Sequence, residues 1–293
     1  MIRRSFGKTK LEVSALGFGA GHIGSPDMTE DAAGTILNRA VDLGVNLIDT
    51  ARGYGLSEER VGRHLSWRRN EVVISTKGGY GVPGVPDWTG ECITQGINQA
   101  LERLQTDYID IFHLHSCPTD TLENSDVIPA LERALKLGKI RVAAYSGDNE
   151  ALEWAALSGK FGSLETSVNI CDQRVLEKVI PNAAQAGLCI IAKRPIANAP
   201  WRYSERPVGN YCETYWERLQ TMKLEPEGLD WDEFALRFSA FAPGVSSAIV
   251  GTSSLTNLAR NVEIVEKGAL SSDSEARVRA AFKMHDQGWV GQV

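Results

Sequence analysis

The stretch VNLIDTARGYGLSEERVGRHLSWRRNEVVISTK, residues 45–77, contains the repeating unit of the fold. Residues 45–49 form a largely apolar run that ends in aspartate, and residues 71–77 form a second run that ends in lysine. Between them, residues 57–65 carry acids in their first turn and apolar residues at helical spacing. Because the two runs are continuously apolar and do not alternate, the pattern predicts parallel strands covered by a helix.

The same strand-and-helix unit repeats along almost the whole chain. The predicted strands span residues 13–19, 45–49, 71–77, 108–115, 140–147, 164–170, 188–195 and 246–253. The predicted helices span residues 29–44, 57–65, 91–104, 125–138, 149–159, 174–187, 231–241 and 254–265. Eight such units in succession predict an α/β protein with a closed (β/α)8 fold, the TIM barrel. One barrel of this size accounts for the chain, so we expect a single domain over residues 1–293.

Two segments lie outside this repeat. Residues 2–14 predict a short β-hairpin that closes the barrel bottom, with Gly7 and Lys8 in its turn. Residues 198–229 form a connection that is longer than a normal strand-to-helix loop and rich in Trp, Tyr and Pro. Loops of that length usually serve function or are mobile.

The composition narrows the class of protein. Lys and Arg total 31 against 37 for Asp and Glu, which gives a net charge of -6 and disfavours nucleic acid and anionic membranes as partners. We find no apolar segment that fits a signal peptide or a membrane span. The five cysteines have no C-x-x-C spacing, so structural zinc and a disulfide framework are not expected. We therefore expect a cytoplasmic monomer or small homo-oligomer that acts on a small molecule.

A dinucleotide-binding alternative must be weighed against the barrel. GAGHIG at residues 19–24 matches G-x-G-x-x-G after a strand, and Asp49 ends the next strand, where a Rossmann fold keeps its ribose acid. The pyrophosphate turn of that fold must open directly into a helix. Here Pro26 intervenes, and the predicted helix does not begin before Thr29. The barrel remains the favoured fold.

Polar residues occupy the ends of three predicted strands, and the carboxyl ends of barrel strands converge on the face that carries the chemistry. These residues are Asp49, Lys77 and His115, and Tyr54 follows Asp49 in the next loop. Taken singly, each is more often a capping, solvated or packing residue. Together they form a chemical unit, because Asp49 can fix the Lys77 ammonium, and that charge would lower the pKa of Tyr54.

A phenol tuned in this way can act as a general acid towards a carbonyl oxygen. His115 could hydrogen-bond the same oxygen and orient the substrate. A carbonyl that receives a proton from Tyr54 also needs a hydride, which no side chain supplies. The residues therefore predict a nicotinamide cofactor.

These motifs give the chain a family resemblance. IDTARGYGLSEERVGRHL (48–65) resembles a signature of the aldo-keto reductases, and STKGG (75–79) and DYIDIFHLHSCP (107–118) resemble the segments that carry the family's lysine and histidine. The two ends, KTKLEVSALGFGAGHIG (8–24) and VSSAIVGTSSLTNLARNVEIV (245–265), are similar to the family as well. The resemblance implies a (β/α)8 barrel that binds NADPH across its top and reduces aldehydes or ketones. It also selects Asp49, Tyr54, Lys77 and His115 as the catalytic residues.

The resemblance further implies a set of cofactor contacts. At the nicotinamide end they are Gly19, Ala20, Gly21, Asp49, Ser146, Gly147, Glu165, Lys193, Arg194, Pro195 and Ile196. Three of these positions depart from the family pattern. Gly147 stands where Asn is usual, Glu165 stands where Gln is usual, and Lys193 stands where many members stack an aromatic ring.

At the adenosine end the implied contacts are Gly251, Ser253, Asn257 and Asn261. Ser253 can hydrogen-bond a 2′-phosphate, and Asn261 can hydrogen-bond the adenine. Asn257 stands where many members place an arginine on that phosphate, while Arg260 lies one helical turn away. NADP(H) is thus the expected cofactor and NAD(H) a possible one.

The pair His113 and His115 could also suggest a metal site, because barrel hydrolases bind metal through H-x-H. Such sites need further His and Asp ligands on later strands. The other histidines, His22, His64 and His285, do not fall at late strand ends. His113 shares strand parity with His115, so we expect it to point into the barrel one layer deeper, as a packed and hydrogen-bonded residue, and we expect no metal.

The sequence therefore predicts an NADP(H)-dependent oxidoreductase that reduces an aldehyde or ketone, with Tyr54 as the general acid. His22, Trp88 and the loop from Trp201 to Tyr215 are candidate walls of the substrate pocket. An NAD(P)-dependent sugar (aldose) dehydrogenase is an alternative with the same chemistry. A non-catalytic nucleotide-sensing subunit is an alternative of a different class.

Overall fold

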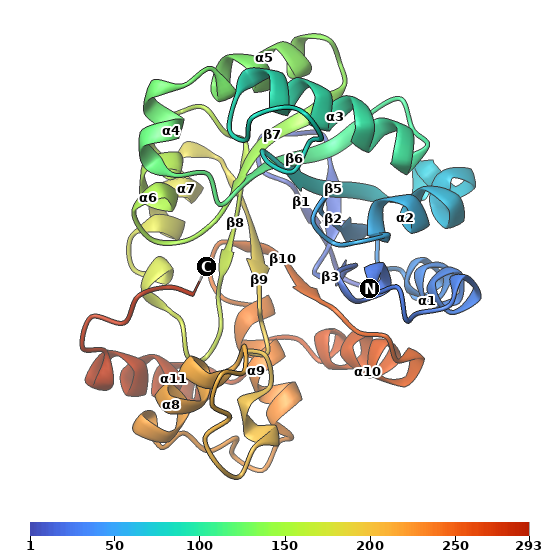
Figure 1. Cartoon of the computed structure of the whole chain (residues 1–293). Helices are drawn as coiled ribbons and strands as arrows, with labels where there is room; N and C mark the ends of the chain where they lie inside the picture. The colour runs from blue at the N-terminus through green and yellow to red at the C-terminus, as the bar shows by residue number, and fades with distance from the viewer. Residues whose placement is uncertain (293) are drawn as a thin grey trace.

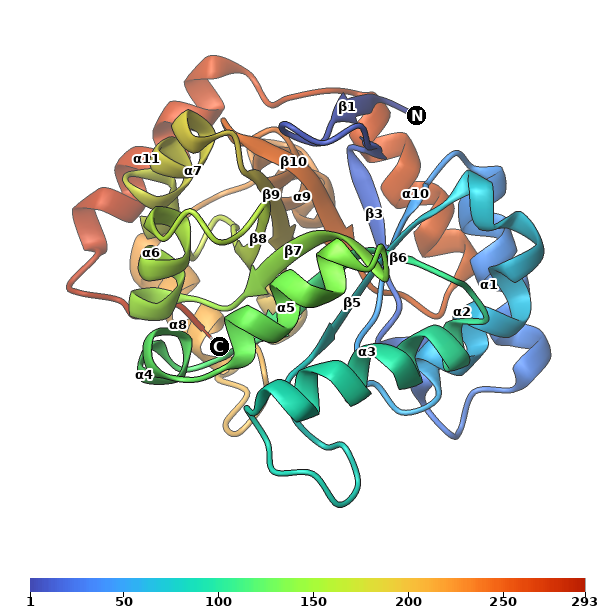
Figure 2. The same cartoon turned by 90° about the horizontal axis from the view of Figure 1, so that it is seen from above.

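Eight parallel strands close into a barrel in the computed structural model, which describes residues 1–292 (Figure 1). The strands are β3 (Leu16–Gly19), β4 (Leu47–Asp49), β5 (Val73–Gly78), β6 (Ile109–His115), β7 (Ile140–Ser146), β8 (Ser163–Ser167), β9 (Cys189–Lys193) and β10 (Val245–Val250). Their order around the barrel follows the chain, and β10 pairs with both β9 and β3 to close it. Figure 2 shows the helices arranged around the outside of these strands. The (β/α)8 barrel is confirmed, and Val293, the last residue of the expected domain, lies outside the described residues.

The eight predicted helices are all present. They are α1 (Glu30–Asp42), α2 (Ser57–Leu65), α3 (Gly90–Leu104), α5 (Val127–Lys136), α6 (Asn149–Leu157), α7 (Val179–Ala186), α9 (Trp231–Ala240) and α10 (Leu255–Glu266). Side-chain caps fix several starts: the Thr29 hydroxyl accepts a hydrogen bond from the Ala32 amide, and the Ser254 hydroxyl accepts one from the Asn257 amide. Helix α7 begins later than predicted, because residues 174–176 form a separate 3-10 turn.

The N-terminal hairpin closes the barrel bottom as predicted. It consists of β1 (Arg3–Ser5) and β2 (Glu12–Ser14), which pair antiparallel, and Gly7 adopts a φ of +56° in the connection. Phe6 and Val13 are fully buried and pack against apolar side chains at the lower end of the barrel strands. The predicted strand 13–19 is in fact two strands, since β2 belongs to the hairpin and β3 to the barrel.

Three helices were not predicted: α4 (Thr119–Asn124), α8 (Glu213–Met222) and α11 (Ser272–His285). Helix α8 lies in the segment 198–229, which was expected to be a loop. Helices α8, α9 and α11 build a second apolar core from Tyr215, Phe234 and Phe282. Helix α8 is thus ordered by packing on helices that come later in the chain, which the local pattern does not reveal.

Strand β8 is shorter than predicted. The prediction extended it from residue 164 to residue 170, but the strand ends at Ser167. Beyond it, Asn169 and Asp172 form an isolated bridge, and the Asn169 side chain accepts a hydrogen bond from the Cys171 amide. This side-chain turn ends the strand although the sequence there stays apolar.

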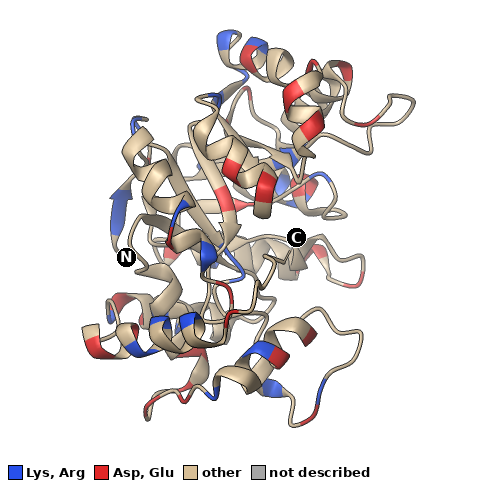
Figure 3. Ribbon diagram, turned by 90° about the vertical axis from the view of Figure 1, so that its left-hand side faces the viewer, with Lys and Arg blue, Asp and Glu red and all other residues tan. Residues whose placement is uncertain are grey.

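The surface carries charges of both signs. In the view of Figure 3, Lys and Arg are interspersed with Asp and Glu on the outer helices. Several of these residues pair, as Glu30 does with Arg63 and Lys178 with Glu153. Among residues 1–292, no helix combines the length and the apolar character needed to cross a bilayer.

The loop between β4 and α2, which carries Tyr54, is fixed from both sides. The Leu56 amide donates to the Gly24 carbonyl at 3.0 Å, and the Ser57 hydroxyl donates to the Ala20 carbonyl at 2.8 Å. Helix α2 then packs on α3 through Gly62, where an added Cβ would lie 2.1 Å from the carbonyl oxygen of Arg103. Close approach of the two helices therefore requires glycine at this position.

This contact gives a stability prediction. We expect Gly62→Ala to lower the free energy of unfolding by about 1–3 kcal/mol, because the added methyl group overpacks the helix contact. Gly96→Ala is the matched control, since its Cβ would meet Val82 at an ordinary 3.7 Å. Alanine favours a helix, so the control should be neutral or stabilising by up to about 1 kcal/mol. Urea unfolding measures both, and equal effects would contradict the close contact.

Candidate active site

A cavity of about 610 Å³ opens at the carboxyl ends of the barrel strands. Its lining includes Asp49, Tyr54, His115, Ser146 and Glu165, and Lys77 lies directly beneath them with 1% of its surface exposed. The strand pairing explains the convergence, because alternate residues of each strand point into the barrel. The four predicted catalytic residues are thus brought together in one place.

Asp49 and Lys77 form a buried ion pair. The Lys77 Nζ lies 2.5 Å from Asp49 Oδ2 and 3.0 Å from the Thr50 carbonyl, and 3.4 Å from Glu165 Oε2. Burial lowers the pKa of Lys77, but the two carboxylates outweigh burial and the net shift is upward. Lys77 therefore stays charged, whereas burial and the nearby Glu165 raise the pKa of Asp49 to about 6.

Tyr54 lies beside this charge, with its ring centroid 5.3 Å from Lys77 Nζ. Lys77 lowers the pKa of Tyr54, as the sequence predicted. Burial and the carboxylates of Asp49 and Glu165 act in the opposite direction, however, and the pKa rises to about 12. The predicted downward shift is therefore wrong for this structure, and Tyr54 keeps its proton at neutral pH, as a proton donor must.

His115 faces Tyr54 across the cavity, with the two rings edge-on at a centroid distance of 6.0 Å. Burial lowers the pKa of His115 to about 3, with smaller contributions from Lys77 and Lys193, so its ring is neutral. Its Nδ1 lies 2.9 Å from the hydroxyl of Tyr80, whose ring stacks on it at 5.6 Å. If the Tyr80 hydroxyl donates to Nδ1, then Nε2 carries the hydrogen and is a donor to a substrate oxygen.

His113 lies one layer deeper, as the strand parity predicted. It is fully buried, and its Nε2 lies 3.0 Å from the Ser75 hydroxyl. The Ser75 hydroxyl donates a hydrogen bond to Asp49 Oδ1 at 2.8 Å, so its oxygen accepts a hydrogen bond from His113 Nε2. Burial and Lys77 lower the pKa of His113 to about 3, so this histidine supports Asp49 as a neutral group.

Ligand atoms of Asp49, His113 and Glu165 lie within 4.8 Å of one another, which is close enough to consider a metal ion. The Lys77 ammonium sits among them, with contacts to Asp49 and Glu165. A metal ion would have to displace this ammonium from its carboxylate partners. The arrangement therefore fits a charged lysine and not a metal site.

The nicotinamide-side residues predicted from the sequence mostly line the same cavity. They are Gly19, Gly21, Ser146, Glu165, Lys193, Arg194, Pro195 and Ile196, with the substrate candidate His22. Lys193 Nζ pairs with Asp148 Oδ2 at 2.8 Å, so the charge that replaces the usual aromatic ring is neutralised.

Three of the residues predicted at the nicotinamide and substrate end do not line the cavity. The Ala20 amide donates to the Asp49 carbonyl and the Gly147 amide to the Glu165 carbonyl, so both residues hold strand ends in place. Trp88 packs edge-on against Tyr80 at 5.8 Å and thus supports the ring that contacts His115. The position of Trp88 therefore indicates a supporting residue and not a wall of the substrate pocket.

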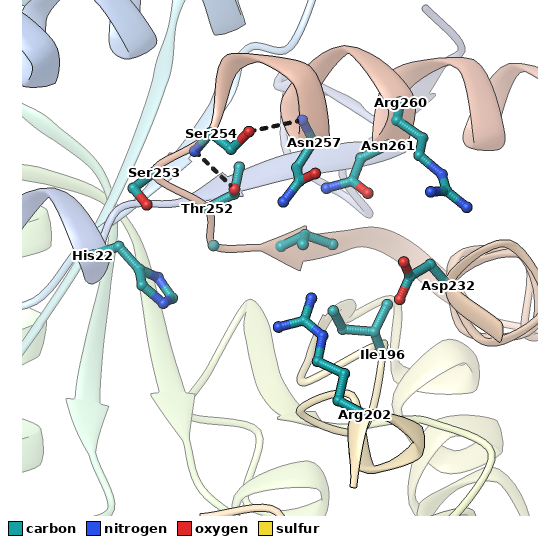
Figure 4. Close-up of a pocket in the computed structure, with 12 residues that line it drawn as sticks. His22, Ile196, Arg202, Asp232, Thr252, Ser253, Ser254, Asn257, Arg260 and Asn261 are labelled. Atoms are coloured by element: carbon teal, nitrogen blue, oxygen red, sulfur yellow. Dashed lines mark hydrogen bonds between the residues drawn. The ribbon is translucent and has the colours of Figure 1, made fainter. Parts of the chain in front are cut away.

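A second hollow of about 200 Å³ adjoins the cavity and shares His22, Ile196, Arg202 and Gly251 with it. Figure 4 shows its lining, in which Ser253 lies in the turn before α10 and Asn257 and Asn261 lie on α10. Together the two hollows form an elongated trough from the barrel mouth to the N-terminus of a helix. Such a trough fits an extended dinucleotide, whose phosphates bind well at a helix N-terminus.

Two basic residues line the second hollow. Arg260 is tied to Asp230 by an ion pair of 2.7 Å. Arg202, from the 3-10 helix η4 (Pro200–Arg202), points into the trough (Figure 4). Within residues 1–292 its guanidinium has no hydrogen bond or ion pair. An arginine without a partner beside a helix N-terminus matches the charge of a phosphate group.

Sequence reasoning missed Arg202 and Tyr80. Arg202 lies in the loop from Trp201 to Tyr215, which the sequence marked as a candidate wall of the substrate pocket, but nothing in the sequence singled out this arginine. Tyr80 follows STKGG by one position, but only the folded loop brings its hydroxyl to His115.

Comparison with known proteins bears on this geometry. The model of the Aldo/keto reductase family matches residues 15–283. L-galactose dehydrogenase of Arabidopsis thaliana is 30% identical to the chain and covers 93% of it and 91% of the relative. D-threo-aldose 1-dehydrogenase of a Pseudomonas species is 26% identical, over 92% of the chain and 95% of the relative. The holo form of an aldo-keto reductase from Bacillus halodurans superposes with a TM-score of 0.84 at 27% identity, over 96% of each chain.

The family match spans nearly the whole barrel, and it includes the strand ends that carry the buried lysine and the histidine and the loop that carries the tyrosine. With a matching barrel among the solved structures, these findings show that the chain belongs to the aldo/keto reductase family.

Proposed function

We propose that the chain is an NADP(H)-dependent oxidoreductase that reduces an aldehyde or ketone to the alcohol. The convergence of Tyr54, His115 and the Asp49–Lys77 pair at the floor of one cavity carries the proposal. Family membership supports a nicotinamide cofactor, and the trough from the barrel mouth to α10 fits one. The direct test is a panel of aldehydes, ketones and sugars assayed with NADPH and with NADH, in which some carbonyl compound should turn over.

The residues divide the chemistry among them. The reduced nicotinamide supplies the hydride when it is bound. Tyr54 donates its proton to the substrate oxygen, and His115 donates a hydrogen bond to the same oxygen and so orients it. Lys77 holds positive charge beside the Tyr54 ring, which stabilises the phenolate left after transfer, and Asp49 holds Lys77 in place.

A sugar dehydrogenase is the second candidate. Two relatives that span most of the chain carry the names L-galactose dehydrogenase and D-threo-aldose 1-dehydrogenase. The same residues serve oxidation when every transfer is reversed, with Tyr54 accepting the proton of the alcohol. The substrate panel separates the two candidates, and an absence of turnover with every compound would favour the non-catalytic nucleotide-sensing subunit.

We propose further that the protein is a single-domain cytoplasmic monomer or small homo-oligomer. All five cysteines are buried and unpaired, as suits a reducing compartment. The hairpin and the second core around α8, α9 and α11 both pack on the one barrel, which supports a single domain.

Tyr54→Phe should reduce kcat for carbonyl reduction by about 10²-fold or more, because the ring stays and only the proton donor is lost. Cofactor affinity, measured by titration, should change little. Tyr145→Phe is a matched control, since Tyr145 is also buried and bonds the Cys117 carbonyl instead of lining the cavity. A Tyr54→Phe variant that kept more than a tenth of the wild-type kcat would exclude Tyr54 as the acid.

The pKa of Tyr54 predicts different pH dependences for carbonyl reduction and for alcohol oxidation. With a pKa raised to about 12, Tyr54 is protonated at lower pH, so reduction should vary little between about pH 6 and pH 9. Oxidation needs the deprotonated form, so its kcat/KM should rise with pH over this range. Lys77→Met should lower kcat/KM for oxidation below the wild-type value at each pH, because the cation that lowers the pKa of Tyr54 is gone. A flat oxidation profile in the wild type would refute the proton-transfer role.

The cofactor preference is expected to be modest. Asn257 offers no charge to the 2′-phosphate, so NADPH should bind more tightly than NADH by a smaller margin than an arginine at this position would give. Asn257→Arg should raise the preference about tenfold or more, mainly by tightening NADPH binding. Arg202→Ala is the contrast. If Arg202 contacts the diphosphate, which both cofactors share, then its loss should weaken the binding of NADPH and NADH equally. Titrations that find a wild-type preference for NADH, or no change with Asn257→Arg, would show that the phosphate lies elsewhere.

A further inference from the structure

Glu165 is a second carboxylate on the buried lysine. It is 2% exposed and lies on β8, and its Oε2 is 3.4 Å from Lys77 Nζ and 3.7 Å from His113 Nε2. The Oε1 atom accepts a hydrogen bond from the Ser146 hydroxyl at 3.3 Å. The Oε2 atom has no hydrogen-bond partner, although it is buried. Glu165 therefore lines this cavity with one carboxylate oxygen that lacks a hydrogen-bond donor.

The charges of this cluster do not balance. Lys77 contributes one positive charge, while Asp49 and Glu165 contribute two negative charges when both are ionised. His113 and His115 add nothing, because burial lowers the pKa of each to about 3. With both carboxylates ionised, one negative charge at the floor of the cavity has no partner, and buried charges without partners are costly.

Neighbouring cations do not cancel this charge. Lys193 is paired with Asp148 at 2.8 Å, so the two together are neutral. Arg194 lines the cavity, but its guanidinium donates to the Ser167 hydroxyl, the Gln292 carbonyl and the Tyr211 hydroxyl. These contacts tie Arg194 to the C-terminal segment and the loop after β9, away from Lys77.

We infer that Glu165 makes the site bind the oxidised nicotinamide, which carries a positive ring, more tightly than the reduced one, which is neutral there. The inference rests on the proposed function, since hydride transfer requires the nicotinamide ring to lie beside Tyr54 and His115. Glu165 lines the same cavity, on the second strand after the one that carries His115. The pyridinium charge supplies the counter-charge that the cluster lacks.

A regulatory consequence follows for the reduction reaction. Tight binding of the oxidised cofactor slows its release after each turnover, and it lets the oxidised form compete with the reduced form for the free enzyme. Reduction by this protein should therefore respond steeply to the ratio of the two cofactor forms. Oxidation of an alcohol or sugar, in contrast, should saturate at a low concentration of oxidised cofactor.

The test compares dissociation constants of oxidised and reduced cofactor for wild type and Glu165→Gln, by calorimetric or fluorescence titration near neutral pH. Glutamine keeps the size of the side chain and removes only its charge. The ratio of the oxidised to the reduced dissociation constant should rise about tenfold or more in the variant, a change that corresponds to about 1.4 kcal/mol. The same factor should appear for the NADP(H) pair and the NAD(H) pair, because the ring is common to both.

Controls make the outcome specific. Glu153→Gln removes the same charge from the exposed surface, where Glu153 pairs with Lys178, and should leave the ratio unchanged. Glu165→Asp keeps the charge and should stay close to wild type. Glu165→Met, neutral and of similar volume, replaces Glu165→Gln if that variant does not fold.

The possible results separate the inference from the function on which it rests. A ratio that stays within about twofold of wild type, or that falls, in a folded neutral variant would overturn the inference and show that Glu165 acts as an uncharged group. Wild-type protein that binds neither cofactor form and turns over no carbonyl compound would instead overturn the proposed function.

Discussion

The buried ion pair between Asp49 and Lys77 is the interaction on which the rest of the site depends. Neither charge could be held under the barrel mouth alone, because a buried charge without a partner costs several kcal/mol or shifts its protonation. Paired, they fix an ammonium beneath the Tyr54 ring and connect β4 to β5. The same positive charge helps to keep His113 and His115 neutral. A single ammonium therefore influences the protonation of each titratable group around it.

The barrel places this polar cluster in its upper layers and keeps the apolar side chains in the layers below. Residues of one parity on each strand point inward, so Ile111, His113 and His115 stand above one another on β6. The lowest layer is apolar and is sealed by Phe6 of the hairpin, while the upper layers carry the charged groups. The cluster borders the cavity above it, where we propose that cofactor and substrate bind.

The proposed cofactor trough departs from the family pattern in the charges at Lys193, Asn257 and Glu165. Lys193 replaces an expected aromatic ring but is neutralised by Asp148, and Asn257 removes a cation from the adenosine end. Arg202 brings a cation into the middle of the trough from a loop after β9. Glu165 adds a carboxylate at the nicotinamide end. Under the proposed function, these charges influence which form of the cofactor the trough favours.

The sequence by itself determined the eight-fold succession of strands and helices, the hairpin, and the identity of the four catalytic candidates. Periodicity and strand-end position are local properties, and the parity of His113 and His115 followed from the alternation of a strand. Tertiary structure alone decided the contacts between distant segments: the helix α8, ordered by later helices, the Tyr80 hydroxyl on His115, and Arg202 in the trough. It also decided the direction of the Tyr54 pKa shift, because that direction depends on burial and on the distance to Glu165, two quantities that only the folded chain defines.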